Sequence, residues 1–292
     1  MKKKQEYKNT LIAFLCVVVL VQSLVLLHVL RPRQAVRRKK KIAVAALHPE
    51  LKTPVAPVLL PRPAPPAKPQ KILGKIALVI DDWGYNLRNQ DFITDNDFHV
   101  TVSVLPFKAY STHVAQLAFH KNKDVVIHMP MEPLSKEEYG LEEKTLLTTM
   151  DAKTVLRFLD EAMAVVPYAK GMSNHMGSKA TQDRHLMKIV FDYLKGHRLF
   201  FLDSLVTSRS LARALAKTSG ILCFQRDVFI DNESDPAYIR NQLKQLADVA
   251  RRKGVAVGLG HDRPSTIAVL TEMIPRLQEE GYQFINLSEI DS

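Results

Sequence analysis

The chain has little cysteine: two residues in 292, Cys16 and Cys223. Cys16 lies within a long apolar run and Cys223 lies far along the chain in its folded part, so the two cannot pair inside one domain. A scaffold held together by disulfides is therefore excluded, and the cysteines do not indicate a redox compartment. The chain also has no internal repeat, which excludes a solenoid or a propeller.

Basic residues are not in excess where the chain folds, although the whole chain has a net charge of +11. Residues 1–74 hold 15 of the 41 lysines and arginines and two of the 30 acidic residues, so residues 75–292 hold 26 basic and 28 acidic residues. A domain of this balance has no positive face for a phosphate backbone, and no nucleic-acid partner is expected.

Residues 11–30 contain no charged side chain. Twenty apolar residues are long enough to cross the hydrocarbon core of a bilayer as one transmembrane helix. Arg31, Pro32 and Arg33 follow where a signal peptide would have small residues, so we expect an uncleaved anchor after a basic N-terminus at residues 1–10. More positive charge flanks the C-terminal side of this run, which by the positive-inside rule would keep the following domain in the cytoplasm.

Residues 31–74 contain nine prolines and no hydrophobic period. A segment of this composition cannot bury a core, and we expect an extended Pro/Lys/Arg-rich linker between the anchor and a folded domain at residues 75–292.

From residue 75 onward, short apolar runs alternate with helical patterns. Strands are predicted at residues 76–80, 100–105, 125–129, 199–202, 228–230, 255–259 and 284–287. Helices are predicted at residues 111–122, 151–166, 181–195, 208–217, 235–254 and 265–281. The first residue of each of the first five ranges is the expected N-cap: Ser111, Asp151, Thr181, Ser208 and Asp235. Alternation of this kind predicts an α/β fold of parallel strands joined by helices, either a barrel or an open doubly wound sheet.

Two adjacent carboxylates, Asp81 and Asp82, directly follow the first predicted strand. The carboxyl ends of parallel strands are where α/β active sites gather, so one carboxylate could bind a metal while the other handles a proton. The alternative is an N-cap before a turn at Trp83 and Gly84.

Polar side chains also follow later strands. His128, Asp203 and His261 each stand at the end of a predicted strand, and His175 precedes a predicted helix. Since the carboxyl ends of parallel strands converge, we expect all of these residues to share one pocket with Asp82.

The chain resembles the divergent polysaccharide deacetylases, which are relatives of the NodB-like carbohydrate esterases. The resemblance covers about residues 75–290 and rests on a set of motifs in a fixed order: Ile80-Asp81-Asp82, Leu105-Pro106, His128-Met129-Pro130-Met131-Glu132-Pro133, Asn174-His175-Met176-Gly177-Ser178, Phe201-Leu202-Asp203-Ser204, Arg226-Asp227-Val228-Phe229-Ile230-Asp231-Asn232 and Gly260-His261. It implies a distorted (β/α) barrel with fewer than eight strands. It also implies an inner-membrane protein whose domain faces the periplasm or the cell exterior, and we give this more weight than the flanking charge.

The resemblance implies roles for individual residues. Asp81 becomes the catalytic base, Asp82 and His128 become metal ligands, and His261 becomes the general acid. Gly258 and Gly260 would let a substrate approach His261 closely. Asp203 could orient His261 or a ligand histidine through a hydrogen bond.

The third ligand departs from the family pattern. The second histidine, four residues after the first, is replaced by Glu132, and no Arg-Pro-Tyr motif stands near Asn174. The third ligand is then His175, which we prefer, or Glu132. Two imidazoles and a carboxylate are typical of catalytic zinc, while manganese, iron and cobalt are alternatives. Asn174 and Ser178 could donate to the sugar or the oxyanion, or could form a capping turn.

The sequence therefore predicts a metal-dependent hydrolase that cleaves an amide bond and removes acetyl groups from an envelope or extracellular polysaccharide such as peptidoglycan. Two alternatives remain. One is an inactive envelope module that binds a glycan or a protein on the same fold, and the other is a metal-dependent phosphoesterase, which would need a second metal and convergent basic residues.

Overall fold

The computed structural model describes residues 71–135 and 140–290. The predicted N-terminus, anchor and nearly all of the predicted linker lie outside these ranges. Within the described ranges, no helix is both long and apolar enough to cross a membrane.

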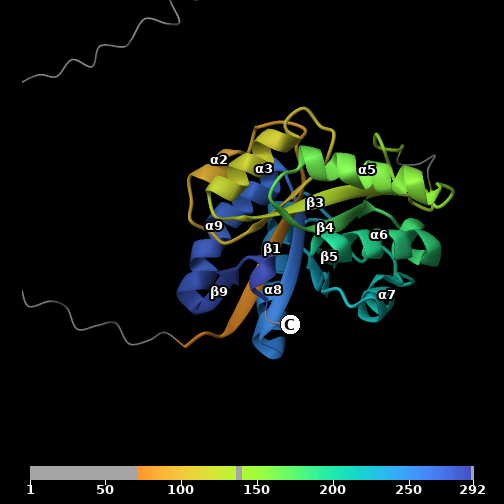
Figure 1. The fold of residues 1–292 in the computed structure, drawn as a ribbon. Coiled ribbons are helices and arrows are strands. Elements are labelled where there is room, and N and C mark those ends of the chain that lie inside the picture. Colours follow the sequence, from red (N-terminus) through yellow and green to blue (C-terminus); the bar gives the residue numbers. More distant parts are fainter. Residues whose placement is uncertain (1–70, 136–139, 291–292) are drawn as a thin grey trace, which may run out of the picture. The chain divides into compact units, whose positions relative to one another are not determined.

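The described residues form an α/β fold around one curled parallel sheet (Figure 1). The strands are β1 (Gly74–Trp83), β2 (Thr101–Val104), β3 (Asp124–Met131), β4 (Ala169–Met176), β5 (Phe200–Asp203), β6 (Cys223–Gln225), β7 (Val228–Phe229), β8 (Val255–His261) and β9 (Tyr282–Ile285). Their order is β6-β5-β4-β3-β2-β1-β8-β7, and β9 pairs with the first half of β1. Among the strands of the described ranges, the short strands β6 and β7 are the two edges, so hydrogen bonding between these strands does not close the barrel.

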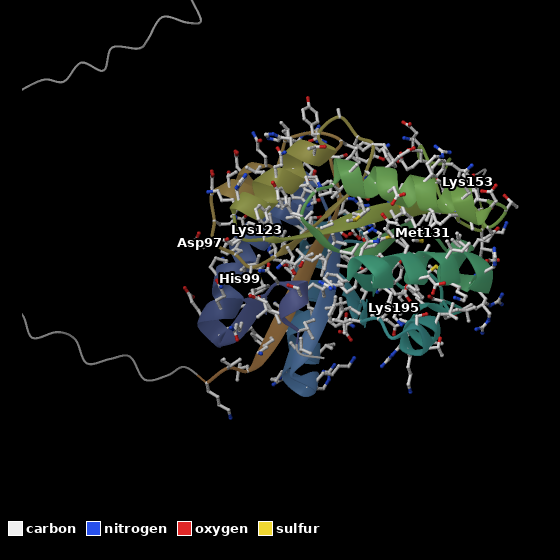
Figure 2. All side chains as sticks on the ribbon, in the orientation of Figure 1. Asp97, His99, Lys123, Met131, Lys153 and Lys195 are labelled. Atoms are coloured by element: carbon white, nitrogen blue, oxygen red, sulfur yellow. The ribbon has the colours of Figure 1, made fainter. Side chains whose placement is uncertain are left out.

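The helices are α2 (Asp91–Thr94), α3 (Ser111–His120), α5 (Ala152–Val165), α6 (Arg184–His197), α7 (Ala212–Ser219), α8 (Pro236–Lys253) and α9 (Pro264–Glu280), with short 3₁₀ helices at Ala180–Gln182 and Leu287–Glu289. Their outer faces carry charged side chains such as Lys153 and Lys195 (Figure 2). Asp151 and Asp235 begin α5 and α8 as predicted, because each carboxylate accepts a hydrogen bond from a backbone N–H three residues later, at 2.7 and 2.9 Å.

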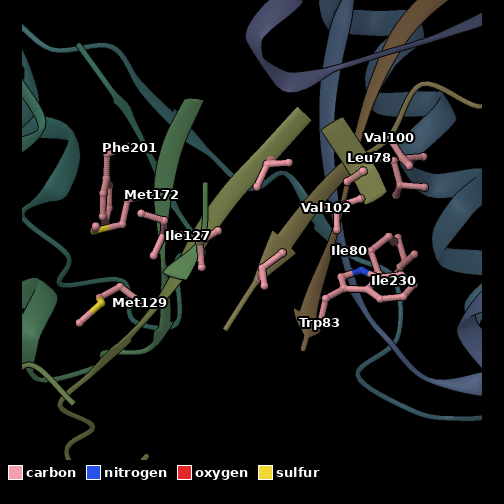
Figure 3. Close-up of a cluster of buried hydrophobic side chains, with 14 of the residues drawn as sticks. Leu78, Ile80, Trp83, Val100, Val102, Ile127, Met129, Met172, Phe201 and Ile230 are labelled. Carbon is pink, nitrogen blue, oxygen red and sulfur yellow. The ribbon is translucent and has the colours of Figure 1, made fainter. Parts of the chain in front are cut away.

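Side chains that alternate along the strands form two hydrophobic clusters. The outer cluster packs strand residues such as Leu78 and Ile80 against the helices (Figure 3). The inner cluster contains strand residues such as Val79 and Leu259, with Leu287 of the last 3₁₀ helix. The inner face of the curled sheet is therefore filled with apolar side chains below the carboxyl ends of the strands.

The predicted elements are mostly present, and the differences have local causes. Strand β4 was missed because it carries Lys170, Gly171 and Asn174 among its apolar residues, and β6 was missed because it is only three residues long. The helix predicted from residue 181 begins at Arg184, because Asp183 caps it by accepting from the N–H of Leu186 at 2.7 Å.

Three other predicted helix starts also differ. Ser111 is the first residue of α3, where its hydroxyl donates to the carbonyl of Leu105 at 2.6 Å. Helix α7 begins at Ala212 rather than near residue 208, and α9 begins at Pro264.

Candidate functional site

The end of β1 brings both adjacent carboxylates to the inner side of the sheet. Asp81 lies two residues after Val79, so its side chain lies on the same inner face of the sheet. Regular alternation would turn Asp82 toward the helices, but the register between β1 and β2 shifts between Ile80 and Trp83, and Asp82 has the left-handed φ of 66°. This bulge reorients the Asp82 side chain, so neighbouring residues serve the same site.

Two histidines reach the same place from β3 and β4. His128 lies opposite Ser173 and His175 lies opposite Pro130 in the paired strands. Asp82 Oδ1 lies 3.3 Å from His128 Nε2 and 3.1 Å from His175 Nδ1. The two ring nitrogens are 3.2 Å apart. Asp82, His128 and His175 therefore form a group whose three potential ligand atoms lie within 4.8 Å of one another.

The chemistry of this group fits a divalent cation. Asp82 Oδ1 is buried and accepts no hydrogen bond, although two ring nitrogens lie close to it. His128 Nδ1 is 2.7 Å from the hydroxyl of Ser173. In the tautomer in which Nδ1 donates to Ser173, Nε2 presents its lone pair to Asp82 and His175. Two imidazole nitrogens and one carboxylate oxygen are the donor set of a catalytic site with an open position.

The two carboxylates differ in electrostatic environment. Asp81 is fully buried, and its burial raises its pKa above the ordinary value, although His128, His261 and the Ser103 hydroxyl oppose this shift. Burial also acts to raise the pKa of Asp82, but two adjacent imidazoles, His128 and His175, outweigh it and hold that pKa below its ordinary range. The arrangement keeps Asp82 ionised, as a ligand must be.

His261 is the last residue of β8 and lies two residues after Leu259, so its side chain lies on the inner face of the sheet, at the same carboxyl ends of the strands. Its ring Nδ1 lies 2.8 Å from Asp231 Oδ1, and its backbone N–H donates to Asp231 Oδ2 at 2.8 Å. Thr266 also donates to Asp231 Oδ2, at 2.7 Å. Burial acts to lower the pKa of His261, yet the bond to Asp231 and the charges of Asp82 and Asp81 raise it above its ordinary value. Because Nδ1 is engaged, Nε2 is the ring atom that remains for other partners.

The predicted role of Asp203 is wrong. It directly follows Leu202, which belongs to the inner cluster, so alternation turns it to the opposite face of β5. There it accepts from the backbone N–H of Leu205 at 2.8 Å and from the Ser210 hydroxyl at 2.8 Å. Asp203 therefore holds the loop after β5, and Asp231 is the residue that orients His261.

Glu132 does not join the metal group. Its Oε2 accepts from the N–H and hydroxyl of Thr148 at 2.6 and 2.7 Å, and its Oε1 accepts from Lys179 Nζ at 3.0 Å. Because both oxygens of this fully buried carboxylate are engaged, Glu132 ties the segment around Thr148 to the start of the first 3₁₀ helix.

Asn174 and Ser178 also have structural partners. Asn174 lies opposite Met129 of the outer cluster, and its amide bridges the N–H of Ser204 and the carbonyl of Met176. Ser178 accepts from the N–H of Leu134 at 3.0 Å. Neither side chain belongs to the metal group. Neither forms the predicted capping turn, because Asp183 caps α6 and the first 3₁₀ helix has no side-chain cap.

The two glycines before His261 serve packing and not access. A methyl group at Gly258 would lie 2.3 Å from Leu246 of α8, and one at Gly260 would lie 2.8 Å from Ile230. These glycines let α8 and the segment after β7 approach β8 closely.

Two residues that matter for the site were missed from the sequence. Asp231 follows the strand predicted at residues 228–230 in the same way that Asp81 follows its strand, so a signal for it was present. Ser173 had no such signal, because only the pairing of β3 with β4 places it beside His128.

The structure does not favour a phosphoesterase. In the described ranges, the only group suited to a metal is Asp82, His128 and His175. Arg226 donates to the carbonyls of Ser204 and Leu205, and Arg263 donates to the carbonyl of Asp231. The arginines near the site are thus engaged with the backbone and not directed at a phosphate.

The sequence and the structure of the chain are similar to those of known proteins. The chain is 37% identical over 206 residues to the Escherichia coli K12 protein YibQ, a match that covers 70% of this chain and 64% of YibQ. A protein of Haemophilus influenzae Rd is also 37% identical over 206 residues, covering 70% of this chain and 73% of its own length. The crystal structure of ATU2773 from Agrobacterium tumefaciens C58 has the same fold, with a TM-score of 0.72, 23% identity, and coverage of 77% of this chain and 92% of that one. The profile of a family described as divergent polysaccharide deacetylase matches residues 78–290. The chain belongs to the divergent polysaccharide deacetylase family.

Proposed function

We propose that this protein is a metal-dependent hydrolase that removes acetyl groups from an envelope polysaccharide. The observation that carries the proposal is the convergence of Asp82, His128 and His175 within 4.8 Å, at the strand ends where Asp81 and His261 also lie. Asp81 is opposite His261 in the pairing of β1 with β8. A ligand group, a buried carboxylate and a carboxylate-bound imidazole are the parts that hydrolysis of an acyl bond requires.

Asp82, His128 and His175 would hold the cation. The donor set suits zinc, and manganese, iron and cobalt are the alternatives. A divalent cation at this position would act as a Lewis acid toward the acetyl carbonyl and the attacking water. Ser173 would keep the His128 ring in the orientation that presents Nε2.

Asp81 and His261 would move the protons. The attacking water loses a proton to Asp81 as its oxygen bonds to the acetyl carbon. His261 Nε2 gives a proton to the amine nitrogen as the carbon–nitrogen bond breaks, which releases acetate and a free amine. Asp231 holds His261 Nδ1 at 2.8 Å and stabilises the ring in its charged form, so the proton is available for the leaving group.

The substrate class follows from family membership. An acetylated glycan such as peptidoglycan would lie outside the cytoplasm, so the proposal includes a domain that faces the periplasm or the cell exterior and is held to the membrane by residues 11–30.

The test is acetate release by the purified chain from acetylated peptidoglycan fragments and from chitin oligomers. We expect release that stops on treatment with a chelator and returns when zinc is added back. His175→Ala should abolish release, whereas His185→Ala, an exposed histidine at the start of α6, should not. A chain that binds metal and glycan but releases no acetate would support the non-catalytic envelope module instead.

A further inference from the structure

Phe229 contacts both His261 and Arg226. Phe229 lies opposite Leu259 in the pairing of β7 with β8, and His261 is two residues further along β8, so the two rings share one face of the sheet. The rings are nearly parallel, with an interplanar angle of 9° and a centroid separation of 5.8 Å. The guanidinium carbon of Arg226 lies 3.9 Å from the centroid of the Phe229 ring.

Arg226 is held rigidly by the loop after β5. Its Nε donates to the carbonyl of Ser204 at 2.8 Å, and its Nη2 donates to the carbonyl of Leu205 at 3.0 Å. A guanidinium can make both bonds at once while its flat face rests on an aromatic ring, whereas a lysine ammonium has neither the planar fork nor the flat face.

Arg226 lies between β6 and β7, so its contact with Phe229 helps to position β7 relative to the other edge of the sheet. Arg226 and Asp227 are the two residues between β6 and β7, which lie at opposite edges of the sheet. Asp227 accepts from the N–H of Val257 in β8 at 2.9 Å, and its own N–H donates to the Val257 carbonyl at 2.8 Å. This link therefore spans the opening of the barrel, and Arg226 fixes where Phe229 stands relative to β5.

Asp231 alone does not fix the imidazole plane of His261. A hydrogen bond to Nδ1 restrains one atom of the ring, and small coupled rotations about the Cα–Cβ and Cβ–Cγ bonds can still change the tilt of the ring plane while that bond persists. A flat contact against the ring restrains the tilt. The two contacts are complementary, and together they set the direction in which Nε2 points.

We propose that Arg226 and Phe229 are positioning residues for His261, with Arg226 fixing Phe229 and Phe229 fixing the plane of the imidazole. This inference rests on the proposed function, in which His261 donates a proton to the leaving amine. Neither residue touches the reacting atoms. Their effect is confined to the steps that need a correctly directed Nε2.

The test compares two substrates and measures the motion of the His261 ring in the full chain. In Phe229→Leu we expect kcat for chitin oligomers to fall on the order of 10-fold to 100-fold, the usual cost of small misplacement, while the rate with an aryl acetate, whose leaving group needs no proton, stays within about twofold. Phe229→Tyr keeps the flat ring and should restore the amide rate. Arg226→Lys should lower the amide rate in the same selective way, and Phe119→Leu, an exposed aromatic on α3, should change neither rate.

Ring motion is the readout that does not depend on activity. In protein carrying ¹³C-labelled histidine, the order parameter of the His261 ring should fall from about 0.85 to below about 0.6 in Phe229→Leu and remain high in Phe229→Tyr. If the chain deacetylates no glycan, the proposed function fails while the ring measurement still tests the stack. An unchanged order parameter in Phe229→Leu, or an equal loss on the two substrates, would overturn the inference.

Discussion

Asp231 accepts two hydrogen bonds from His261, one from ring Nδ1 and one from the backbone N–H, each at 2.8 Å. One carboxylate thus holds both the ring and the backbone at the end of β8. The pKa of Asp231 is lowered, because the bonds from His261 outweigh its burial, and the pKa of His261 is raised. The pair is therefore most stable with both partners charged.

This pairing predicts a pH-dependent stability. The contribution of His261 is complete below its ordinary pKa of about 6.5 and is lost as the pH rises through its higher folded value. The contribution of Asp231 is complete above its ordinary value of 3.8 and is lost as the pH falls through its lower folded value. Asp231→Asn should therefore cost about 2 kcal/mol near pH 5.5, the usual contribution of a charged hydrogen bond, and less at pH 9. Chemical denaturation at both pH values measures this, with Asp192→Asn on the exposed face of α6 as control; a cost that is the same at both pH values would contradict the pairing.

Ser173 should affect metal affinity without binding the metal. Its hydroxyl lies 2.7 Å from His128 Nδ1 and 3.0 Å from the hydroxyl of Ser103, all within the buried part of the sheet. Ser173→Ala removes the partner that orients the His128 ring, so we expect zinc affinity to fall roughly 10-fold to 100-fold. Ser178→Ala is the control. Equal zinc affinity in Ser173→Ala and the wild type, measured by calorimetry, would show that His128 needs no such support.

His261→Ala should separate proton donation from metal binding. We expect the metal content to be unchanged and amide deacetylation to slow on the order of 100-fold to 10,000-fold, the usual worth of a positioned acid. An aryl acetate should be slowed much less, because its leaving group needs no proton. Loss of metal together with an equal loss on both substrates would make His261 a ligand, and the acid would then be a different group.

A reporter fused after Ser292 tests localisation. The proposed envelope substrate requires an exported domain, whereas the positive charge after residues 11–30 favours a cytoplasmic one. We expect activity from a reporter that works only outside the cytoplasm. Activity only from a cytoplasmic reporter would contradict both the proposed location and the proposed substrate class.

The sequence was sufficient for the fold class because the buried strands are continuous apolar runs, such as the one before Asp81. It was also sufficient to bring Asp82, His128 and His175 together, since the first two follow predicted strands and His175 precedes a predicted helix. Strand β4 could not be predicted, because its polar residues hide the apolar pattern.

The faces of the strands were harder to predict than their positions. Asp203 stands at the end of β5 but on the outer face of the sheet, because it directly follows Leu202 of the inner cluster. Regular alternation would place Asp82 on the outer face too, and it reaches the site only because of a bulge at which Asp82 has a left-handed φ. Residue order does not reveal such a bulge, so a rule based on strand ends selects both correct and incorrect residues.

The most direct measurement of the central claim is the metal content of the purified chain and its ligand variants. We predict one divalent ion per wild-type chain, and loss of that ion in Asp82→Ala, His128→Ala and His175→Ala, because each change removes one of three protein donors. Glu132→Gln should keep the ion and lower the thermal stability instead, since Glu132 holds Thr148 and Lys179. Loss of the ion in Glu132→Gln with full occupancy in His175→Ala would contradict the assignment of the site.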